Sequence, residues 1–188
     1  VNGDRPRQLP MVMGHEGAGI VEAVGPSVDR LRPGDHVVSV FVPSCGHCAP
    51  CRAGRPALCE PGAAANGQGV LIDGGSRLRR GDETLYHMTG VSCFAECMTV
   101  SQNSLVQVDP AIPLDIAALM GCAVLTGAGA VFNSRDVCPG CSTAVVGLGG
   151  VGLSAVMAAR AAGAGKIIAV DLLDDKLQIA HELGATHL

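Results

Sequence analysis

Four closely spaced cysteines are the residues of this sequence whose types and spacing most clearly suggest chemistry. They form a Cys-x2-Cys-x2-Cys-x7-Cys run and are Cys45, Cys48, Cys51 and Cys59. Thiolates this close in sequence can surround one tetrahedral Zn²⁺ ion, which is borderline-soft and needs no redox partner. Because four protein ligands leave no open position for a substrate, we predict a structural zinc site and expect the chemistry of the chain elsewhere.

The same cysteines would have another meaning in a secreted protein, where they could be buried thiols or disulfide partners. The sequence holds 9 cysteines, an odd number, and its first residues show no basic segment followed by an apolar run. Both features favour zinc binding in a reducing cytoplasm. His47 lies inside the cluster, but four cysteines already complete a shell, so we expect no ligand role for it.

A glycine-rich motif lies between an expected strand at 142–146 and an expected helix at 150–162. It satisfies Gly-x-Gly-x-x-Gly and consists of Gly147, Leu148, Gly149, Gly150, Val151 and Gly152. In this position the first glycine permits a tight turn, the second lets the backbone approach a pyrophosphate, and the third lets helix and strand pack closely. The helix N-terminus adds N–H donors and a favourable dipole, so the motif predicts a dinucleotide site.

Asp171 follows the next expected strand, 19 positions after Gly152. At this distance a carboxylate accepts hydrogen bonds from the adenosine ribose hydroxyls and repels a 2′-phosphate, so the sequence favours NAD over NADP. Lys176 could touch the adenosine end of the cofactor or could equally be an exposed helix lysine.

Two further segments hold polar groups near glycines: Gly14-His15-Glu16-Gly17, and Gly121-Cys122 followed by Thr126-Gly127. A single histidine is more often structural than a ligand, and a single buried cysteine is more often part of a core. Neither segment indicates a function by itself.

Short strands are expected in the first part of the chain, which positions the cysteine cluster. Glycine and proline separate candidate strands at 19–24, 35–41 and 94–100, and the last alternates between two faces as a half-buried strand does. These elements predict an all-β module, a small barrel or sandwich. The stretch 62–90 is glycine-rich and indicates no function.

The spacing of apolar residues changes after residue 109. A helix is expected from Pro113, with apolar residues at helical spacing. It is followed by a strand at 142–146, a helix at 150–162, a strand at 166–170 and a helix at 174–183. This βαβα order predicts a parallel sheet covered by helices.

Composition excludes several other classes. The 188 residues are 48% hydrophobic with a net charge of −4, and no apolar run approaches the length of about 20 residues that spans a bilayer. Only 2% of residues are aromatic and no basic surface is indicated, so we expect neither nucleic-acid nor membrane binding. A small-molecule substrate is favoured.

Taken together, these motifs resemble the medium-chain zinc-dependent alcohol dehydrogenases. The likeness covers nearly the whole chain and keeps one order: Gly14-His15-Glu16, Arg32-Pro33-Gly34-Asp35, the four cysteines, Phe94-Ala95-Glu96, Gly121-Cys122 with Thr126-Gly127, the glycine motif, and Asp171 with Lys176. The resemblance implies an α/β plus all-β fold, with a GroES-like catalytic domain over 1–124 followed by the first part of a Rossmann NAD-binding domain over 125–188.

The resemblance also implies a catalytic zinc ion and its ligands. His15 and Cys122 would match two protein ligands of that ion, with Glu16 beside the metal, while Thr126 and Val151 would line the nicotinamide pocket. The implied reaction moves a hydride from an alcohol to NAD, with zinc acting as a Lewis acid.

The chain departs from the family pattern at both ends. The family has a further cysteine ligand about twenty residues before His15, with a proton-relay hydroxyl after it, and this chain begins 14 residues before His15. It also stops after two expected strands of the six in a dinucleotide domain. We therefore expect a partial chain with little or no activity alone.

Several alternatives stay open at this stage. The substrate could be a primary or secondary alcohol or a hydroxymethyl-thiol adduct, and a polyol or amino-alcohol dehydrogenase is a related possibility. A different class would be a non-enzymatic zinc- or NAD-binding module. The resemblance implies a cytoplasmic homodimer or homotetramer for the full-length protein.

One more pair of cysteines stands apart from these motifs. Cys138-Pro139-Gly140-Cys141 has the spacing of a redox pair or half a metal site. Because Pro-Gly is a turn sequence and no second pair lies nearby, the sequence favours a plain turn.

Overall fold

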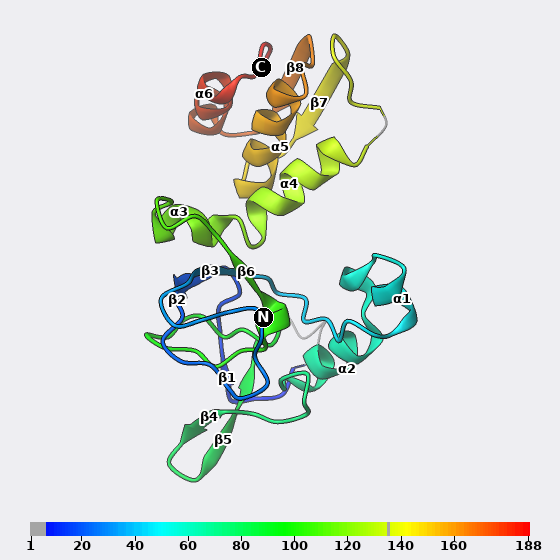
Figure 1. Ribbon diagram of the computed structural model, residues 1–188. Helices are drawn as coiled ribbons and strands as arrows, with labels where there is room; N and C mark the ends of the chain where they lie inside the picture. Colours follow the sequence, from blue (N-terminus) through cyan, green and yellow to red (C-terminus); the bar gives the residue numbers. More distant parts are fainter. Residues whose placement is uncertain (1–6, 135) are drawn as a thin grey trace. The chain divides into compact units, whose positions relative to one another are not determined.

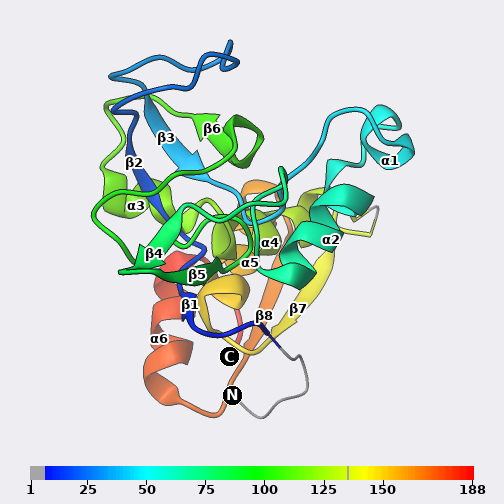
Figure 2. The same cartoon turned by 90° about the horizontal axis from the view of Figure 1, so that it is seen from below.

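The computed structural model describes residues 7–134 and 136–188, and their backbone contacts divide the chain into two compact units. The first unit ends at Gly121 and the second runs from Cys122 to Leu188. The expected limit of the catalytic domain at residue 124 falls just inside helix α4 (Ala123–Phe132) of the second unit. Figures 1 and 2 show the elements of each unit.

The first unit contains two small sheets. In one, β3 (His36–Ser39) lies between β2 (Ala18–Ile20) and β6 (Leu105–Gln107), and both pairings are antiparallel. The side chains of Val37 and Val38 are buried. Because β3 is central and buried, it gives the neighbouring loops a fixed surface to pack against.

The second sheet of this unit has the order β1-β5-β4. Strand β1 (Met11–Val12) pairs in parallel with β5 (Glu83–His87), which forms an antiparallel hairpin with β4 (Leu78–Arg80). The two hairpin strands lie side by side in Figure 2. Gly81 has a φ of 61° in the tight loop between them, a conformation that glycine adopts without steric cost.

Short helices follow the strands. The first unit contains α1 (Ala49–Arg52), η1 (Pro56–Leu58), α2 (Glu60–Gln68), η2 (Gln102–Ser104) and α3 (Leu114–Leu119). Helix α2 begins with Glu60 and Pro61 and ends before Gly69, whose φ is 69°. An acidic first turn, an early proline and a left-handed glycine after the last turn are the usual signals for the start and end of a helix.

The first unit differs in two stretches from what the sequence indicates, and the strand predicted at 94–100 is wrong. Residues 94–100 form no strand; the chain bends there, and Phe94 has 76% of its surface exposed. The N–H groups of Cys93 and Phe94 instead donate to the carbonyls of Gly14 and Met13, and both edges of β3 are taken by other strands. The stretch 62–90 also holds more order than expected, since it contains most of α2 and the β4–β5 hairpin.

The second unit confirms the predicted βαβα order. Strand β7 (Ser142–Val146) pairs in parallel with β8 (Lys166–Val170), joined by α5 (Gly150–Ala161) and followed by α6 (Asp174–Leu183). In Figure 1, α5 lies between α4 and α6. The buried core of this unit is Val131, Leu148, Val156, Ala158, Ala159, Ile167, Ala169, Ala180 and Ala185. Small alanines let the helices approach the sheet closely.

The fold class is therefore the predicted one, a β module followed by an α/β unit with a parallel strand pair. Among the described residues, no helix is both long and apolar enough to cross a membrane.

Candidate functional site

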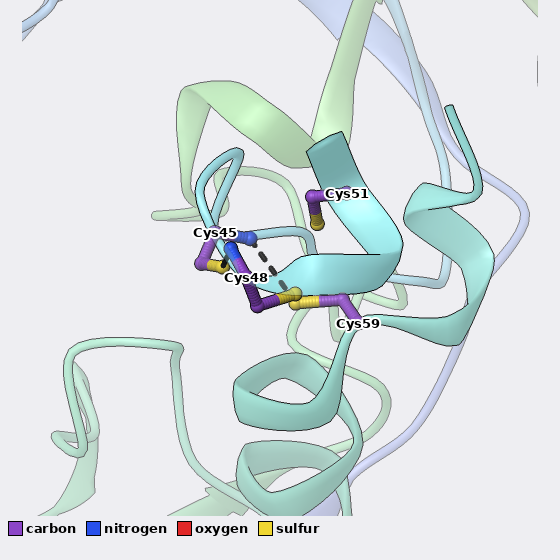
Figure 3. A group of neighbouring side chains, drawn as sticks. All are labelled: Cys45, Cys48, Cys51 and Cys59. Carbon is purple, nitrogen blue, oxygen red and sulfur yellow. Dashed lines mark hydrogen bonds between the residues drawn. The ribbon is translucent and has the colours of Figure 1, made fainter. Parts of the chain in front are cut away.

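The four predicted zinc ligands lie together in the first unit. Cys45 and Cys48 precede α1, Cys51 lies within it, and Cys59 caps the N-terminus of α2 (Figure 3). Their sulfur atoms all lie within 4.8 Å of one another. Four sulfurs at about 2.3 Å from one zinc ion stand about 3.8 Å apart, so a small inward movement accommodates the ion. The predicted structural four-cysteine zinc site is present.

Backbone N–H groups point at two of these sulfurs. The N–H of Cys45 donates to Sγ of Cys59 at 3.2 Å, that of Cys48 to Sγ of Cys45 at 3.3 Å, and that of Gly62 to Sγ of Cys59 at 3.3 Å. The first two are the dashed lines of Figure 3. Such donors stabilise thiolate charge, which is the form that binds zinc.

The thiols of the cluster differ in acidity. Backbone N–H groups, first that of His47, lower the pKa of Cys45 to about 6, whereas loss of solvation raises the pKa of Cys51 to about 12. Zinc binds thiolates, so Cys51 in particular must lose its proton when the ion binds. His47 itself is exposed, with Nδ1 at 2.8 Å from the Cys45 carbonyl oxygen.

The segment that carries His15 and Glu16 is held against β3. Gly14 has a φ of 98°, and a Cβ there would lie 2.6 Å from the backbone nitrogen of Phe94. The hydroxyl of Ser39, which is fully buried, accepts from the Gly17 N–H at 3.1 Å and donates to the Gly17 carbonyl at 3.0 Å. Glycine on both sides of the polar pair therefore allows close contact with the neighbouring backbone.

Ser39 also supports the end of the first unit. A Cβ on Gly121 would lie only 2.3 Å from the Ser39 carbonyl oxygen, so only glycine allows this approach. Gly17 and Gly121, which precede or follow predicted metal ligands by one or two positions, thus rest on the same residue of β3. Sequence reasoning missed Ser39, because nothing in its local pattern distinguishes it from any strand serine.

The sequence indicated that Cys122 lies at the end of the helix expected from Pro113. Instead, Cys122 occupies the N-cap position of α4 in the second unit. The next residue, Ala123, lies beside the glycine motif: a Cβ on Gly150 would be 3.4 Å from the Ala123 Cβ. The cysteine and the start of α5 thus lie at the same end of the second unit.

Thr126 and Val151 lie on two helices that pack closely. A Cβ on Gly127 would lie 2.3 Å from the carbonyl oxygen of Val151 and 2.7 Å from the Ser154 Cβ. Thr126 is exposed, and Val151 has 44% of its surface exposed. Both side chains are therefore available to a ligand at this end of the unit.

The glycines of the motif differ in how closely the neighbouring backbone approaches them. Gly147 has a φ of 88°, and a Cβ on Gly152 would lie 1.8 Å from the Gly147 carbonyl oxygen. Apart from Gly149 itself and its two chain neighbours, no described residue has a heavy atom within 4 Å of the Cβ position of Gly149. The first and third glycines are thus required by the fold itself, while the open space at the second fits the approach of a phosphate.

Asp171 is held at the edge of this turn. Its Oδ2 accepts from the Leu148 N–H at 2.7 Å, and its Oδ1 accepts from the N–H groups of Leu172 at 2.8 Å and Leu173 at 3.1 Å. These bonds, first that from Leu148, lower the pKa of Asp171. A carboxylate has about four acceptor positions, so an ionised Asp171 keeps capacity for a ribose hydroxyl.

Two predicted cofactor residues, Leu148 and Lys176, already interact with Asp171. Leu148 is fully buried in the core, and its N–H is already used by Asp171. Lys176 lies partly buried in the first turn of α6, where its charge contributes to lowering the pKa of Asp171.

A β module with a four-cysteine zinc site, followed by a dinucleotide-type βαβα unit, defines a class of zinc-containing oxidoreductases. Comparison with protein families agrees: the alcohol dehydrogenase GroES-like domain matches residues 1–110, and the zinc-binding dehydrogenase family matches residues 150–188. The chain belongs to the medium-chain zinc-dependent alcohol dehydrogenase family.

Individual relatives share this similarity. Alcohol dehydrogenase B of Mycobacterium tuberculosis (strain ATCC 25618 / H37Rv) is 44% identical over 100% of this chain and 50% of that protein. S-(hydroxymethyl)glutathione dehydrogenase of Synechocystis sp. is 46% identical over 99% of this chain and 51% of its own length. A crystal structure of an alcohol dehydrogenase zinc-binding domain protein from Burkholderia ambifaria gives a TM-score of 0.90 at 48% identity, covering 97% of this chain and 50% of that one. The chain spans about half the length of the curated relatives it matches.

Proposed function

We propose that this chain contributes to a zinc-dependent oxidoreductase that transfers a hydride from a primary or secondary alcohol to NAD, giving an aldehyde or ketone. The observation that carries the proposal is the placement of Cys122 in the second unit. This thiol begins α4 beside the glycine motif, so the proposed metal ligand and the proposed dinucleotide turn lie at one end of the unit. Hydride transfer needs such closeness of metal and nicotinamide.

His15 and Cys122 are the proposed ligands of the catalytic metal, with Glu16 beside it. An imidazole and a thiolate are donors that zinc prefers, and the glycines next to these segments, Gly17 and Gly121, both lie against Ser39 within the first unit. Zinc bound by these groups would supply a Lewis acid toward the alcohol oxygen, and NAD would accept the hydride.

The second unit provides the proposed cofactor contacts. The glycine motif, residues 147–152, receives the pyrophosphate at the N-terminus of α5, and Thr126 and Val151 line the nicotinamide pocket. Asp171 accepts hydrogen bonds from the ribose and repels a 2′-phosphate, which selects NAD over NADP. Lys176 lies near Asp171 and contacts the adenosine end.

The substrate and the assembly belong to the same proposal. One similar protein is named for S-(hydroxymethyl)glutathione and another simply as an alcohol dehydrogenase, so alcohols and hydroxymethyl-thiol adducts are the two substrate classes to test. We further propose that the natural protein carrying this chain is a cytoplasmic homodimer or homotetramer.

The test uses the natural protein that carries residues 1–188. NADH formation is measured with ethanol, a longer alcohol, and the adduct of formaldehyde with glutathione. We expect activity with at least one substrate, a strong preference for NAD over NADP, and loss of more than about 100-fold in Cys122→Ser, because even outer-shell changes at metal sites cost about 10–100-fold. Zinc and NAD binding without NADH formation from any of the three would instead indicate a non-enzymatic module.

A further inference from the structure

Two cysteines outside both candidate sites lie at the two ends of a tight turn. Cys138-Pro139-Gly140-Cys141 joins the end of α4 to β7, and the Cys141 N–H donates to the Cys138 carbonyl oxygen at 3.1 Å. Gly140 has a φ of 80°. Proline in the second position and a left-handed glycine in the third are typical of a type II turn, so the predicted turn is confirmed.

The turn brings the second thiol against the backbone of the first cysteine. The N–H of Cys138 donates to Sγ of Cys141 at 3.3 Å, so the Cys141 side chain points back across the turn toward the first cysteine. The end residues of a β-turn have Cα atoms less than about 7 Å apart, and disulfides join Cα atoms about 4.4–6.8 Å apart. A β-turn therefore holds its two end residues at about the separation that a disulfide spans.

The surrounding loop holds this turn in place. The Gly140 N–H donates to the Gly163 carbonyl at 2.8 Å, and the Gly165 N–H donates to the Cys141 carbonyl at 2.8 Å. A Cβ on Gly165 would lie 3.0 Å from the Gly140 carbonyl oxygen. The loop between α5 and β8 fixes both the turn and its second cysteine. Little conformational entropy is therefore lost when the two sulfurs form a disulfide.

The two thiols differ in access. Cys138 is exposed, whereas Cys141 is partly buried. An exposed thiol with a partly buried neighbour matches an attacking cysteine and a resolving cysteine. A metal site is not indicated, because the group of four cysteines in the first unit is the only cluster of three or more potential ligands among the described residues.

We propose that Cys138 and Cys141 form a thiol–disulfide redox pair whose oxidant is a low-molecular-weight disulfide. The Cys138 thiolate attacks one sulfur of the oxidant, which releases one thiolate and leaves a mixed disulfide. The Cys141 thiolate then attacks the Cys138 sulfur, forms the internal disulfide and releases the second thiolate. The two protons lost by the cysteines pass to the two released thiolates, so two cysteines are oxidised while one small disulfide is reduced to two thiols.

The experiment uses the zinc-loaded natural protein and oxidised glutathione as the probe. Free thiols are alkylated after the exposure, and trypsin cleavage after Arg135 and Arg160 gives one peptide, 136–160, that holds both cysteines and no other. We expect this peptide to lose two hydrogen atoms and to take up no alkyl group. Excess reduced glutathione should restore the doubly alkylated form.

Variants separate a redox pair from a merely exposed thiol. In Cys141→Ser the resolving thiol is absent, so the glutathione mixed disulfide at Cys138 should accumulate, whereas wild type should show almost none. Cys138→Ser, at an exposed position, should lose the internal disulfide, and Cys97→Ser, which removes another exposed thiol, should leave it unchanged. A wild-type peptide that stays doubly alkylated, or that keeps as much mixed disulfide as Cys141→Ser, overturns the proposal.

Discussion

The backbone N–H of Leu148 donates to Oδ2 of Asp171 at 2.7 Å, which ties the glycine motif to the end of the neighbouring strand. The carboxylate thus has a structural role besides the proposed contact with ribose. Two further N–H groups, those of Leu172 and Leu173, donate to its other oxygen. Because these bonds favour the ionised form, the position of the turn depends on the charge of Asp171.

The first prediction concerns Asp171→Asn and pH. The pKa of Asp171 is lowered in the folded protein, so its contribution to stability is present above the unfolded value of about 3.9 and is lost as the pH falls through the lower folded value. At neutral pH the variant should melt at a lower temperature than wild type. The difference in melting temperature should shrink as the pH is lowered below about 3.9.

Asp174→Asn is the matched control, since it removes the same charge from an exposed position in the first turn of α6. Its melting temperature should differ less from that of wild type at neutral pH. A gap between wild type and Asp171→Asn that stays constant through the acid range would contradict the prediction. Circular dichroism melts at several pH values give the comparison.

The second prediction separates two glycines of one motif. Gly152→Ala places a Cβ against the Gly147 carbonyl oxygen, at 1.8 Å without relaxation, and should destabilise the fold by about 1–3 kcal/mol or more. At Gly149 a Cβ meets open space and the backbone is extended, so alanine should change stability by no more than about 0.5 kcal/mol. Urea denaturation measures both values.

NAD binding, unlike stability, should be sensitive to substitution of Gly149. Gly149→Ala blocks the approach of the pyrophosphate and should weaken NAD binding by at least about tenfold, equivalent to about 1.4 kcal/mol. Titration calorimetry on the folded variant tests this loss. If Gly149→Ala binds NAD as tightly as wild type does, the glycine motif is not the pyrophosphate site.

The third prediction concerns the cysteine cluster. Cys59 is almost fully buried, and its sulfur accepts from two backbone N–H groups. Cys59→Ser should weaken zinc binding at this site by more than about 100-fold, because outer-shell changes alone cost about 10–100-fold. Zinc content after dialysis against a chelator measures the loss.

An exposed cysteine provides the comparison for that variant. Cys97→Ser should keep the zinc content of wild type, since Cys97 is exposed and lies outside the cluster. Chelation of wild-type protein should also lower its melting temperature, because zinc bound to the folded state stabilises it. Equal zinc content in both variants would contradict the assignment of Cys59 as a ligand.

The fourth prediction concerns Ser39→Ala. The substitution removes the hydroxyl that accepts from the Gly17 N–H and donates to the Gly17 carbonyl. The carbonyl keeps its bond from the Ser39 N–H at 2.8 Å, but the buried Gly17 N–H loses the hydroxyl as its acceptor. The free energy of unfolding should fall by about 1–3 kcal/mol. At Ser134, whose hydroxyl accepts from an exposed N–H, alanine should cost no more than about 0.5 kcal/mol. Similar losses in the two variants would argue against a special role for Ser39.

The second unit could be predicted from sequence because its signals are local. The strand, turn and helix around residues 142–161 appear in the order that the glycine motif requires, and α6 begins and ends where its pattern changes. The cysteine cluster could be predicted for the same reason, since three of its ligands lie within seven consecutive residues, 45–51.

The first unit was harder to predict because its order depends on distant partners. Residues 94–100 alternate like a strand, but alternation does not supply a neighbouring strand, and β3 pairs with β6 instead. Helix α2 is rich in alanine and glycine and has no clear apolar stripe, so periodicity gave no signal for it. The contact of Ser39 with Gly121 joins residues far apart in sequence and is visible only in three dimensions.

The crowding at Gly152 also limits how the gene can vary. Every amino acid other than glycine has a Cβ, which would meet the carbonyl oxygen of Gly147, so only synonymous changes of this codon preserve the close approach. A library with random codons at this position, selected only for folded protein, should therefore return glycine almost exclusively. The same selection at codon 149 should accept several small residues, and only a second round of selection for nucleotide binding should remove them.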